Sequence, residues 1–447
     1  MTKYWIYIFL AVISTCGCSS TNQERPNVIL IITDDQGYGD IGAHGNPLIK
    51  TPHMDQLYAE SIRFTNFHVS PTCSPTRAAL MTGRYTNRTG AWHTIGGWSL
   101  LRSNEKTLGN LFSEGGYVTG AFGKWHLGDN YPFRAKDRGF QSTVVHGGGG
   151  VQQTPDYWGN DYFDDTYFYN GKPKQYEGYC TDVFFDEAMS FIRQSKDQPF
   201  FCYISTNAPH SPFNVPPSYL DLYEGIPDTI LANDQKRFYG MISNIDENIG
   251  RLRASLVEQN IADNTLLIFM SDNGTAAGYR SREGRTMGFN SNMRGTKNSP
   301  YEGGHRVPFY VYWKDGKVVG GKDISTLAAH IDIMPTLAEW CKLKLPENHL
   351  PIDGRSLVPL VEGNNLELKN RILITDSQRK QVPEKWTKTA VMSRNWRLVN
   401  GEELYNLDND PGQEFNLFKD QKMLVDTLRE AYDDWWSSME ETFQQEP

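Results

Sequence analysis

The chain has 447 residues, of which 38% are hydrophobic, 22% charged and 13% aromatic, and its formal net charge is −9. This length is enough for two or three domains of roughly 100–200 residues each, and the composition is typical of a globular protein with a large core. An acidic chain has no overall positive field, so we expect no nucleic-acid partner. The many tryptophans and tyrosines suit stacking against sugars and core packing equally well, so they decide nothing alone.

Residues 1–18 are predicted to be an export segment. The apolar run within residues 3–13 has the basic start of a secretory signal and is too short for a permanent membrane helix. The small residues after it resemble a bacterial lipoprotein box with Cys16 or Cys18 as the lipidated residue, although Thr15 departs from the usual pattern for either cysteine. We therefore expect an exported bacterial protein, periplasmic or anchored as a lipoprotein at the outer membrane or cell surface.

The mature chain opens with a continuous apolar run over residues 27–32, the pattern of a strand buried on both faces. Asp34 and Asp35 follow it, and two adjacent carboxylates repel each other unless a cation lies between them. A solvated turn is the alternative interpretation. Further along, Thr51 and Pro52 predict the start of a helix, with Thr51 as its N-cap.

Residues 73–77 read Cys-Ser-Pro-Thr-Arg and are predicted to begin a second helix. The segment is ambiguous by itself. Arg77 could lower the pKa of the Cys73 thiol and make it a nucleophile, whereas a buried structural cysteine is the commoner role. The N–H groups at the start of a helix favour an anion, which gives a nucleophile for an anionic substrate a physical reason to lie there.

Three more apolar runs, over residues 117–122, 199–205 and 265–270, predict further buried strands. The polar residues that follow them are Lys124 and His126, His210, and Asp272 and Asn273, respectively. In open α/β sheets, ligands bind outside the carboxyl ends of the strands, so these residues and the first aspartates predict one site at that edge.

The residue types at this edge indicate what the site holds. Oxygen donors suit Ca²⁺ or Mg²⁺ rather than zinc. The oxygen donors are Asp34, Asp35, Asp272 and Asn273. Lys124 and His126 lie two residues apart, so an extended chain would point both to the same side, although a surface pair has the same spacing.

A Gly- and Pro-rich loop over residues 294–308 follows the last of these strands, and its Lys297 is either a solvated lysine or an anion ligand. The pattern changes near residue 360, where short strand-like runs, a turn and an amphipathic helix over residues 423–439 begin. We therefore predict a main domain over residues 26–360 and a small antiparallel α+β subdomain over residues 361–447.

In combination these motifs resemble those of the type I sulfatases, over about residues 26–418. Residues 73–84 are similar to that family's maturation signature, Cys-x-Pro-x-Arg followed by Thr-Gly-Arg, and residues 123–128 match its Gly-Lys-Trp-His-Leu-Gly motif. The resemblance implies an α/β fold, the alkaline-phosphatase-like sandwich with a central, mostly parallel sheet and a smaller C-terminal domain. It also implies that a maturation enzyme oxidises Cys73 to formylglycine. The implied ligands of one calcium ion are Asp34, Asp35, Cys73, Asp272 and Asn273.

The resemblance further implies how sulfate esters are cleaved. Arg77 would support the hydrated aldehyde, and Lys124 and Lys297 would contact the sulfate. His210 would protonate the leaving alcohol, and His126 would help to break the covalent sulfate intermediate. One hydroxyl of the hydrated aldehyde attacks sulfur, and the other then expels sulfate and restores the aldehyde, an exit route that an unmodified thiol lacks.

The implied substrate is a sulfated oligosaccharide or polysaccharide, cut in exo or endo fashion. The aromatic segment over residues 147–178 is either a rim for sugar rings or a packed loop. An arginine cluster after residue 273 either binds a uronate or a second sulfate, or is a solvated loop. The candidate substrate-binding residues are His93, His146, Arg280, Arg282, Arg285 and Arg294.

Two rival functions remain at this point. One is a phosphatase or phosphonate monoester hydrolase of the same superfamily, and the other is a non-catalytic glycan-binding lipoprotein. The Cys-x-Pro-x-Arg segment with one calcium site argues against the first, and the complete set of catalytic residue types argues against the second. Burial is the expected state of the other cysteines, although a Cys180–Cys202 bridge is compatible with an oxidising compartment.

Overall fold

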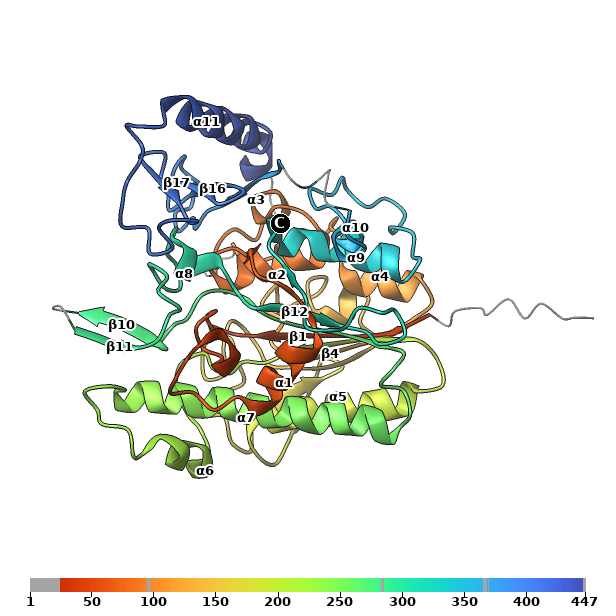
Figure 1. Cartoon of the computed structure of the whole chain (residues 1–447). Coiled ribbons are helices and arrows are strands. Elements are labelled where there is room, and N and C mark those ends of the chain that lie inside the picture. Colours follow the sequence, from red (N-terminus) through yellow and green to blue (C-terminus); the bar gives the residue numbers. More distant parts are fainter. Residues whose placement is uncertain (1–24, 95–97, 283–284, 365–367, 369, 445–447) are drawn as a thin grey trace, which may run out of the picture.

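The computed structural model describes residues 25–94, 98–282, 285–364, 368 and 370–444. The predicted export segment, with Cys16 and Cys18, lies outside these residues. Figure 1 shows a large body built around one sheet, with a smaller C-terminal subdomain, coloured dark blue, packed above it.

The sheet of the large body is mostly parallel, as predicted. Within the described residues it has ten strands. In spatial order these are β13 (Asp323–Ile324), β2 (Ile62–Phe64), β12 (Phe309–Tyr312), β9 (Thr265–Ser271), β1 (Asn27–Thr33), β8 (Phe200–Ser205), β4 (Val118–Gly123), β5 (Ser142–Val145), β6 (Thr166–Tyr169) and β7 (Lys172–Gln175). The strands from β9 to β5 all run parallel, whereas β12, β6 and β7 are antiparallel to their neighbours.

Strand β1 explains why the sheet lies between two helical layers. All seven of its residues are buried, because alternate side chains enter different cores. Val28, Leu30 and Ile32 pack with α2 (Cys73–Thr82), α4 (Leu108–Glu114) and α9 (Ile333–Trp340). Ile29 and Ile31 pack with α1 (Pro52–Glu60), α5 (Cys180–Ser195) and α7 (Asn233–Glu258). Figure 1 shows these two sets of helices on opposite sides of the sheet, so the predicted α/β sandwich is confirmed.

The remaining elements of the large body are mostly short. Its described helices are α1 (Pro52–Glu60), α2 (Cys73–Thr82), α3 (Thr86–Thr89), α4 (Leu108–Glu114), α5 (Cys180–Ser195), α6 (Pro217–Leu220), α7 (Asn233–Glu258), α8 (Glu302–His305), α9 (Ile333–Trp340) and α10 (Val358–Val361). Its described 3₁₀ turns are η1 (Gly42–His44), η2 (Ala135–Asp137), η3 (Asp221–Tyr223) and η4 (His330–Asp332). Two small sheets pair β3 (Phe67–His68) with β14 (Ala328–Ala329) and β10 (Tyr279–Arg282) with β11 (Arg285–Gly288).

The C-terminal subdomain is antiparallel, as predicted. Its sheet consists of β15 (Ile372–Thr375), β16 (Ala390–Ser393), β17 (Trp396–Val399) and β18 (Glu403–Asn406), and α11 (Lys422–Ser437) and η5 (Glu440–Gln444) follow. The apolar face of α11, with Val425, Leu428 and Tyr432, packs on Val391 and Leu398 of the sheet. The division of the chain at residue 360 stays a prediction.

A buried ion pair ties this subdomain to the large body. Arg397 on β17 donates to the Glu302 carboxylate at 2.6 Å and to the Asn66 side chain at 2.8 Å, and its own side chain is fully buried. Burial alone would raise the pKa of Glu302, but Arg397 and the nearby His68 and His305 lower it below its usual range. The stabilisation from this carboxylate is therefore present above the ordinary glutamate pKa and is lost as the pH falls below it.

We expect Arg397→Ala to destabilise the protein by about 3–5 kcal/mol, because it leaves Glu302 charged and buried without its partner. Thermal unfolding monitored by circular dichroism measures the loss. Lys385→Ala is the matched control, since it breaks the exposed Lys385–Asp433 pair and should cost less than about 1 kcal/mol. Equal, small losses of stability for both variants would contradict the stabilising role of the buried Arg397–Glu302 pair.

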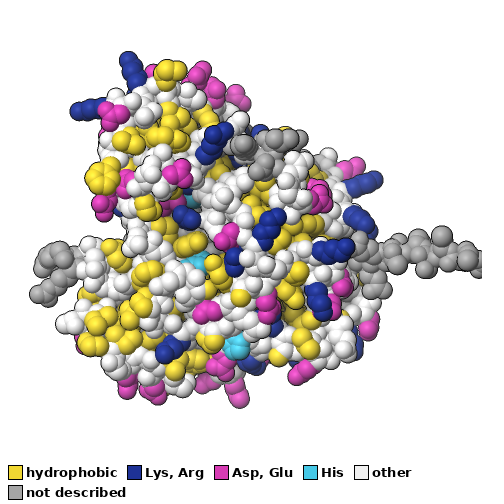
Figure 2. Space-filling view, viewed as in Figure 1, with side chains coloured by type: hydrophobic (Ala, Val, Ile, Leu, Met, Phe, Trp, Pro, Cys, Tyr) yellow, Lys and Arg dark blue, Asp and Glu magenta, His cyan; other side chains and the backbone are white. Residues whose placement is uncertain are grey.

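The surface carries both signs of charge. On the face in Figure 2, acidic and basic side chains are interspersed with apolar ones. Among the described residues, no helix combines the length and the apolar character that crossing a bilayer requires.

Candidate active site

The carboxyl ends of β1 and β9 meet at one edge of the sheet. Their parallel register places Thr33 beside Ser271, so the residues that follow come into contact. The Asp35 N–H donates to Asp272 Oδ1 at 3.0 Å, and Asn273 Nδ2 donates to Asp35 Oδ1 at 2.9 Å. The sheet topology itself therefore brings the four predicted oxygen donors together.

Helix α2 delivers Cys73 to the same edge. Cys73 is the first residue of this helix, all of whose residues are buried, and Gly83 ends the helix in a left-handed conformation at φ 67°. Ligand atoms of Asp34, Cys73 and Asp272 all lie within 4.8 Å of one another. Burial raises the pKa of the Cys73 thiol, so the unmodified cysteine is a weak nucleophile here.

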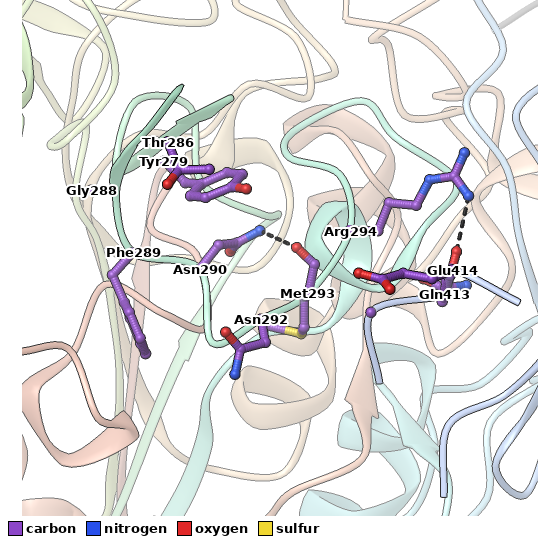
Figure 3. A pocket seen from close by; sticks show the side chains of 11 residues that line it. Tyr279, Thr286, Gly288, Phe289, Asn290, Asn292, Met293, Arg294, Gln413 and Glu414 are labelled. Atoms are coloured by element: carbon purple, nitrogen blue, oxygen red, sulfur yellow. Dashed lines mark hydrogen bonds between the residues drawn. The ribbon is translucent and has the colours of Figure 1, made fainter. Parts of the chain in front are cut away.

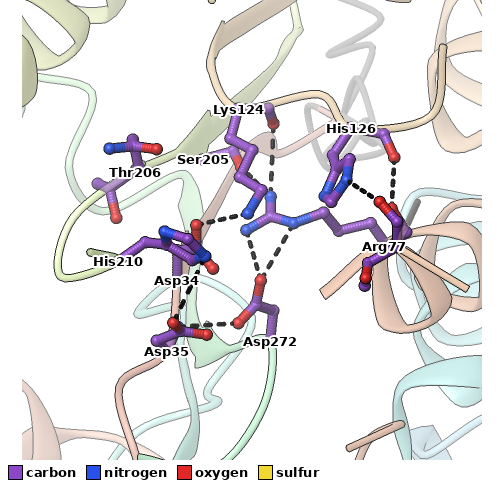
Figure 4. Close-up of polar contacts among 12 residues, drawn as sticks. Asp34, Asp35, Arg77, Lys124, His126, Ser205, Thr206, His210 and Asp272 are labelled. Carbon is purple, nitrogen blue, oxygen red and sulfur yellow. Dashed lines mark hydrogen bonds and ion pairs between the residues drawn. The ribbon is translucent and has the colours of Figure 1, made fainter. Parts of the chain in front are cut away.

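Arg77 lies one turn after Cys73 and its side chain is fully buried. It donates to Asp272 Oδ2 from Nε at 3.1 Å and from a terminal nitrogen at 2.7 Å. Its other terminal nitrogen bonds the Ser205 hydroxyl and approaches the Tyr203 hydroxyl at 3.4 Å, as Figure 4 shows for Ser205. Sequence reasoning missed Tyr203 and Ser205, although their spacing of two on β8 places both side chains on one face of the strand.

Two lysines and a histidine contact the aspartates, and Figure 4 shows Lys124 and His210 beside them. Lys124 Nζ lies 2.5 Å from Asp34 Oδ2, and Lys297 Nζ lies 2.6 Å from Asp35 Oδ1. His210 Nε2 lies 3.8 Å from the other oxygen of Asp35. Burial lowers the pKa of His210 to about 4, with Asp35 acting in the opposite direction. Lys297 is therefore held by Asp35 and is not a freely solvated loop lysine, and its role as an anion ligand stays a prediction.

The backbone conformation that places His126 at the site was not predicted from the sequence. Its φ is 56°, so the prediction that an extended chain aligns it with Lys124 is wrong. The ring is buried, with Nε2 3.2 Å from the Thr94 carbonyl oxygen and Nδ1 lacking a partner among the described residues. Burial, Lys124 and Arg77 all lower its pKa. Gly149 packs so closely that a Cβ there would lie 2.6 Å from Nε2.

The oxygen donors fit a hard divalent cation. Asp34 Oδ1 and Asn273 Oδ1 are buried and have no hydrogen-bond partner among the described residues, which is costly unless an ion or water satisfies them. Burial raises the pKa of Asp34 well above its usual range even beside Lys124, and a bound cation would act in the opposite direction. The donor set of carboxylate and amide oxygens is one that Ca²⁺ and Mg²⁺ prefer.

A second cluster, formed by His68, Glu302 and His305, also brings three ligand atoms within 4.8 Å. Here Arg397 already neutralises Glu302 and lies 3.2 Å from His68 Nε2. A guanidinium at this distance repels a metal ion. We therefore interpret this cluster as part of the buried ion-pair contact between the large body and the C-terminal subdomain.

The described members of the predicted arginine cluster, Arg280 and Arg294, already have protein partners. Arg280 on β10 is ion-paired with Asp234 of α7. Arg282 and Arg285 are opposite each other in the backbone register of the β10–β11 hairpin. This hairpin projects away from the large sheet in Figure 1. Their side chains lie outside the described structure, so their binding role stays a prediction.

Arg294 lies in an open groove of about 680 Å³ between this hairpin and residues 412–414 (Figure 3). Its guanidinium stacks on the Tyr301 ring at 3.7 Å, donates to the Gln413 carbonyl at 3.0 Å and lies 3.8 Å from Glu403. Because these contacts join the large body to the C-terminal subdomain, the structure favours a structural role for Arg294.

The other predicted binding residues are buried near the site. His146 Nδ1 lies 2.8 Å from the Gly147 carbonyl oxygen, and its Nε2 lacks a partner among the described residues. His93 is 6% exposed and precedes Thr94, whose carbonyl contacts His126. The aromatic segment is divided, since Tyr162 is buried in the core whereas Trp158 is 96% exposed.

The described cysteines are unpaired and buried, as expected for most of them. They are Cys73, Cys180, Cys202 and Cys341. The alternative of a Cys180–Cys202 bridge is therefore wrong.

Comparison with known proteins agrees with this geometry. A family model described as Sulfatase matches residues 26–343. The chain belongs to the sulfatase family. This sulfatase is 32% identical over 379 residues to the N-acetylgalactosamine-6-sulfatase of Homo sapiens, and the alignment covers 78% of this chain and 68% of the human protein. It is 30% identical over 369 residues to an arylsulfatase of Hemicentrotus pulcherrimus, covering 76% and 62% of the two chains.

Among solved structures, this sulfatase resembles Ps i-CgsB in complex with k-i-k-neocarrahexaose. The TM-score is 0.81 at 30% identity, and the match covers 92% of this chain and 93% of the other. The enzyme is accordingly a hydrolase of sulfate esters, with the fold that the sequence predicted.

Proposed function

We propose that this sulfatase removes sulfate from a sulfated oligosaccharide or polysaccharide, using a formylglycine made from Cys73. The observation that carries the proposal is the convergence at one buried point. The Cys73 sulfur lies within 4.8 Å of carboxylate oxygens of Asp34 and Asp272. Lys124 approaches Asp34, and Lys297 and His210 approach the adjacent Asp35. Relatives named for sulfated sugars support a saccharide substrate.

The side chains of this site can bind and orient a sulfate. Lys124 and Lys297 would hold sulfate oxygens, because both ammonium groups are directed to the centre of the site and are kept there by carboxylates. Arg77, fixed by Asp272 and Ser205, would orient the residue at position 73. When present, the hydrated formylglycine supplies the nucleophilic hydroxyl and, later, the aldehyde exit route.

We propose one calcium ion as the partner of Asp34, Asp35, Cys73, Asp272 and Asn273. The buried oxygens of the aspartates and Asn273 fit such an ion, and a divalent cation there would stabilise negative charge on the sulfate oxygens. We also propose that a formylglycine-generating enzyme matures the protein. Export to the periplasm or cell surface, with a lipid on Cys16 or Cys18, remains our proposal from the sequence.

Turnover by two preparations tests the function. Protein co-expressed with a formylglycine-generating enzyme is expected to hydrolyse 4-methylumbelliferyl sulfate and to release sulfate from a panel of sulfated oligosaccharides, detected by ion chromatography. Protein made without that enzyme should be inactive. Equal activity of the two preparations would contradict a formylglycine mechanism.

The same assay addresses the rival functions. A phosphatase or phosphonate monoester hydrolase would cleave the matching phosphate or phosphonate ester faster than the sulfate ester. A glycan-binding lipoprotein would bind the oligosaccharides and release nothing. We expect neither, because Lys124, Lys297 and His210 converge on the two aspartates beside Cys73, an arrangement that binding alone does not need.

We expect His210→Ala to lower kcat/KM for a saccharide sulfate by about 10²- to 10⁴-fold, since a sugar alkoxide leaves poorly without a proton. The loss for 4-methylumbelliferyl sulfate should be at least tenfold smaller, because a phenolate leaves without help. Steady-state kinetics on both substrates provide the comparison. Equal losses would show that His210 acts on binding or folding and not on the leaving group.

A further inference from the structure

A loop of the C-terminal subdomain reaches the active site. Residues 376–389 join β15 to β16, whose ends pair through Thr375 and Ala390. On this loop the Ser377 hydroxyl lies 2.6 Å from the Asn298 side-chain oxygen. Asn298 follows Lys297, and its N–H donates to the Pro71 carbonyl, two residues before Cys73, at 2.8 Å. The loop therefore contacts the segments that carry a lysine and the nucleophile position.

The same loop contacts the other side of the site through His93. The His93 ring accepts from the Thr94 N–H at 2.7 Å and also hydrogen-bonds the backbone of Arg379. The Thr94 carbonyl in turn lies 3.2 Å from His126 Nε2. Arg379 is thus connected to the sulfate-binding site by a short chain of contacts.

Positive charge gathers where this loop begins and ends. Arg379 and Lys388 are both exposed, and neither makes an ion pair with any residue that the structure describes. Burial lowers the pKa of Lys388, and so does the nearby Arg379; the same two causes lower the pKa of His93. These groups therefore repel one another's charge, which an anionic ligand would relieve.

The carboxylates of this loop are already occupied. Glu384 pairs with Lys380 at 2.5 Å. Asp376 is buried and accepts from Asn87 at 3.0 Å and from Gln378 at 2.8 Å. An uncompensated cationic pair beside a site for sulfate esters is an arrangement that suits a second anion on the same substrate.

We propose that Arg379 and Lys388 form a subsite for a second anionic group of the saccharide, a sulfate ester or a uronate carboxylate near the scissile sulfate. His93 is a positioning residue that holds the backbone of Arg379. This inference rests on the proposed saccharide sulfatase function. It assigns substrate selection to the C-terminal subdomain and not to the arginines of the β10–β11 hairpin.

The test compares Arg379→Ala/Lys388→Ala with wild type on two matched substrate pairs. The first pair is a uronate-linked N-acetylgalactosamine 6-sulfate disaccharide and its uronate methyl ester. The second is a carrageenan disaccharide with two sulfates and the same disaccharide with one. Lys380→Ala is the control, since it removes a charge from the same loop but one that Glu384 already pairs.

We expect the double variant to lower kcat/KM about tenfold or more for the charged member of at least one pair, a loss of about 1.4 kcal/mol. The less charged member, 4-methylumbelliferyl sulfate and the control variant should change less than about twofold. The pair that responds identifies the anion as carboxylate or sulfate. Equal losses for both members, or no preference of the wild type for a charged member, would overturn the subsite.

Two readouts separate this inference from the function on which it rests. Absence of aryl sulfate turnover by the wild-type protein would refute the proposed sulfatase function and not the anionic subsite. Calorimetric binding of the same pairs to protein with unmodified Cys73 tests the subsite without turnover. Weaker binding of the charged members by the double variant alone supports it, and unchanged binding rejects it.

Discussion

Cys73→Ala is expected to reduce sulfatase turnover by about 10⁴-fold or more, the scale of losing a covalent nucleophile. The lysines, Arg77 and His210 would still bind and orient a sulfate ester, so KM should change less than kcat. Measuring kcat and KM for 4-methylumbelliferyl sulfate, with inorganic sulfate release as a second readout, shows this division.

Cys341→Ala is the matched control for this experiment. Cys341 is another buried cysteine, but it packs in the apolar core among residues such as Leu111 and Leu337. Its removal should cost some stability and leave kcat near the wild-type value. If Cys73→Ala kept more than about 1% of wild-type kcat while folded, position 73 would not carry the nucleophile.

Asp272→Asn is expected to abolish both activity and the response to calcium. Asp272 has two tasks, because Oδ2 accepts two bonds from Arg77 while Oδ1 lies among the predicted ligands. Removing its charge leaves the buried Arg77 without the carboxylate that neutralises it, which costs about 3–5 kcal/mol. Calcium at about 100 times its Kd should raise the stability of the wild type by about 2.7 kcal/mol, and chelation should reverse this gain.

Asp332→Asn separates the loss of an ion pair from the loss of a metal ligand. Asp332 forms a comparably buried pair with Arg371 at 2.6 Å, outside the cluster of oxygen donors. This variant should also unfold at a lower Tm, yet keep the rise in Tm on adding calcium and its loss with chelator. A calcium-dependent rise in Tm that survives in Asp272→Asn would contradict the proposed ligand set.

The sequence predicted the parts of the fold that local pattern controls. Continuous apolar runs gave β1, β4, β8 and β9 within one or two residues, because a strand buried on both faces needs apolar side chains at every position. It missed β5, β6 and β7, which are short and partly exposed and so carry no such run. The β10–β11 hairpin was also missed, because its segment had been interpreted as a loop.

The candidate site was predictable to the extent that it follows from topology. Parallel strands carry their carboxyl ends to one edge, so Asp34, Lys124, His210 and Asp272 were expected together before any contact was known. Contacts between distant segments were not predictable. The Arg397–Glu302 pair joins residues 95 apart, and no local pattern marks either as buried. The left-handed backbone conformation at His126 was likewise not predictable from the sequence.

The mass of the peptide containing residue 73 tests the central claim most directly. Tryptic cleavage after Arg63 and Arg77 releases residues 64–77, which can be weighed from protein purified together with its sulfatase activity. Conversion of the Cys73 side chain to the aldehyde that supplies the nucleophile predicts a peptide about 18 Da lighter than the thiol form. An active preparation in which this peptide carries only the unmodified cysteine would contradict the account.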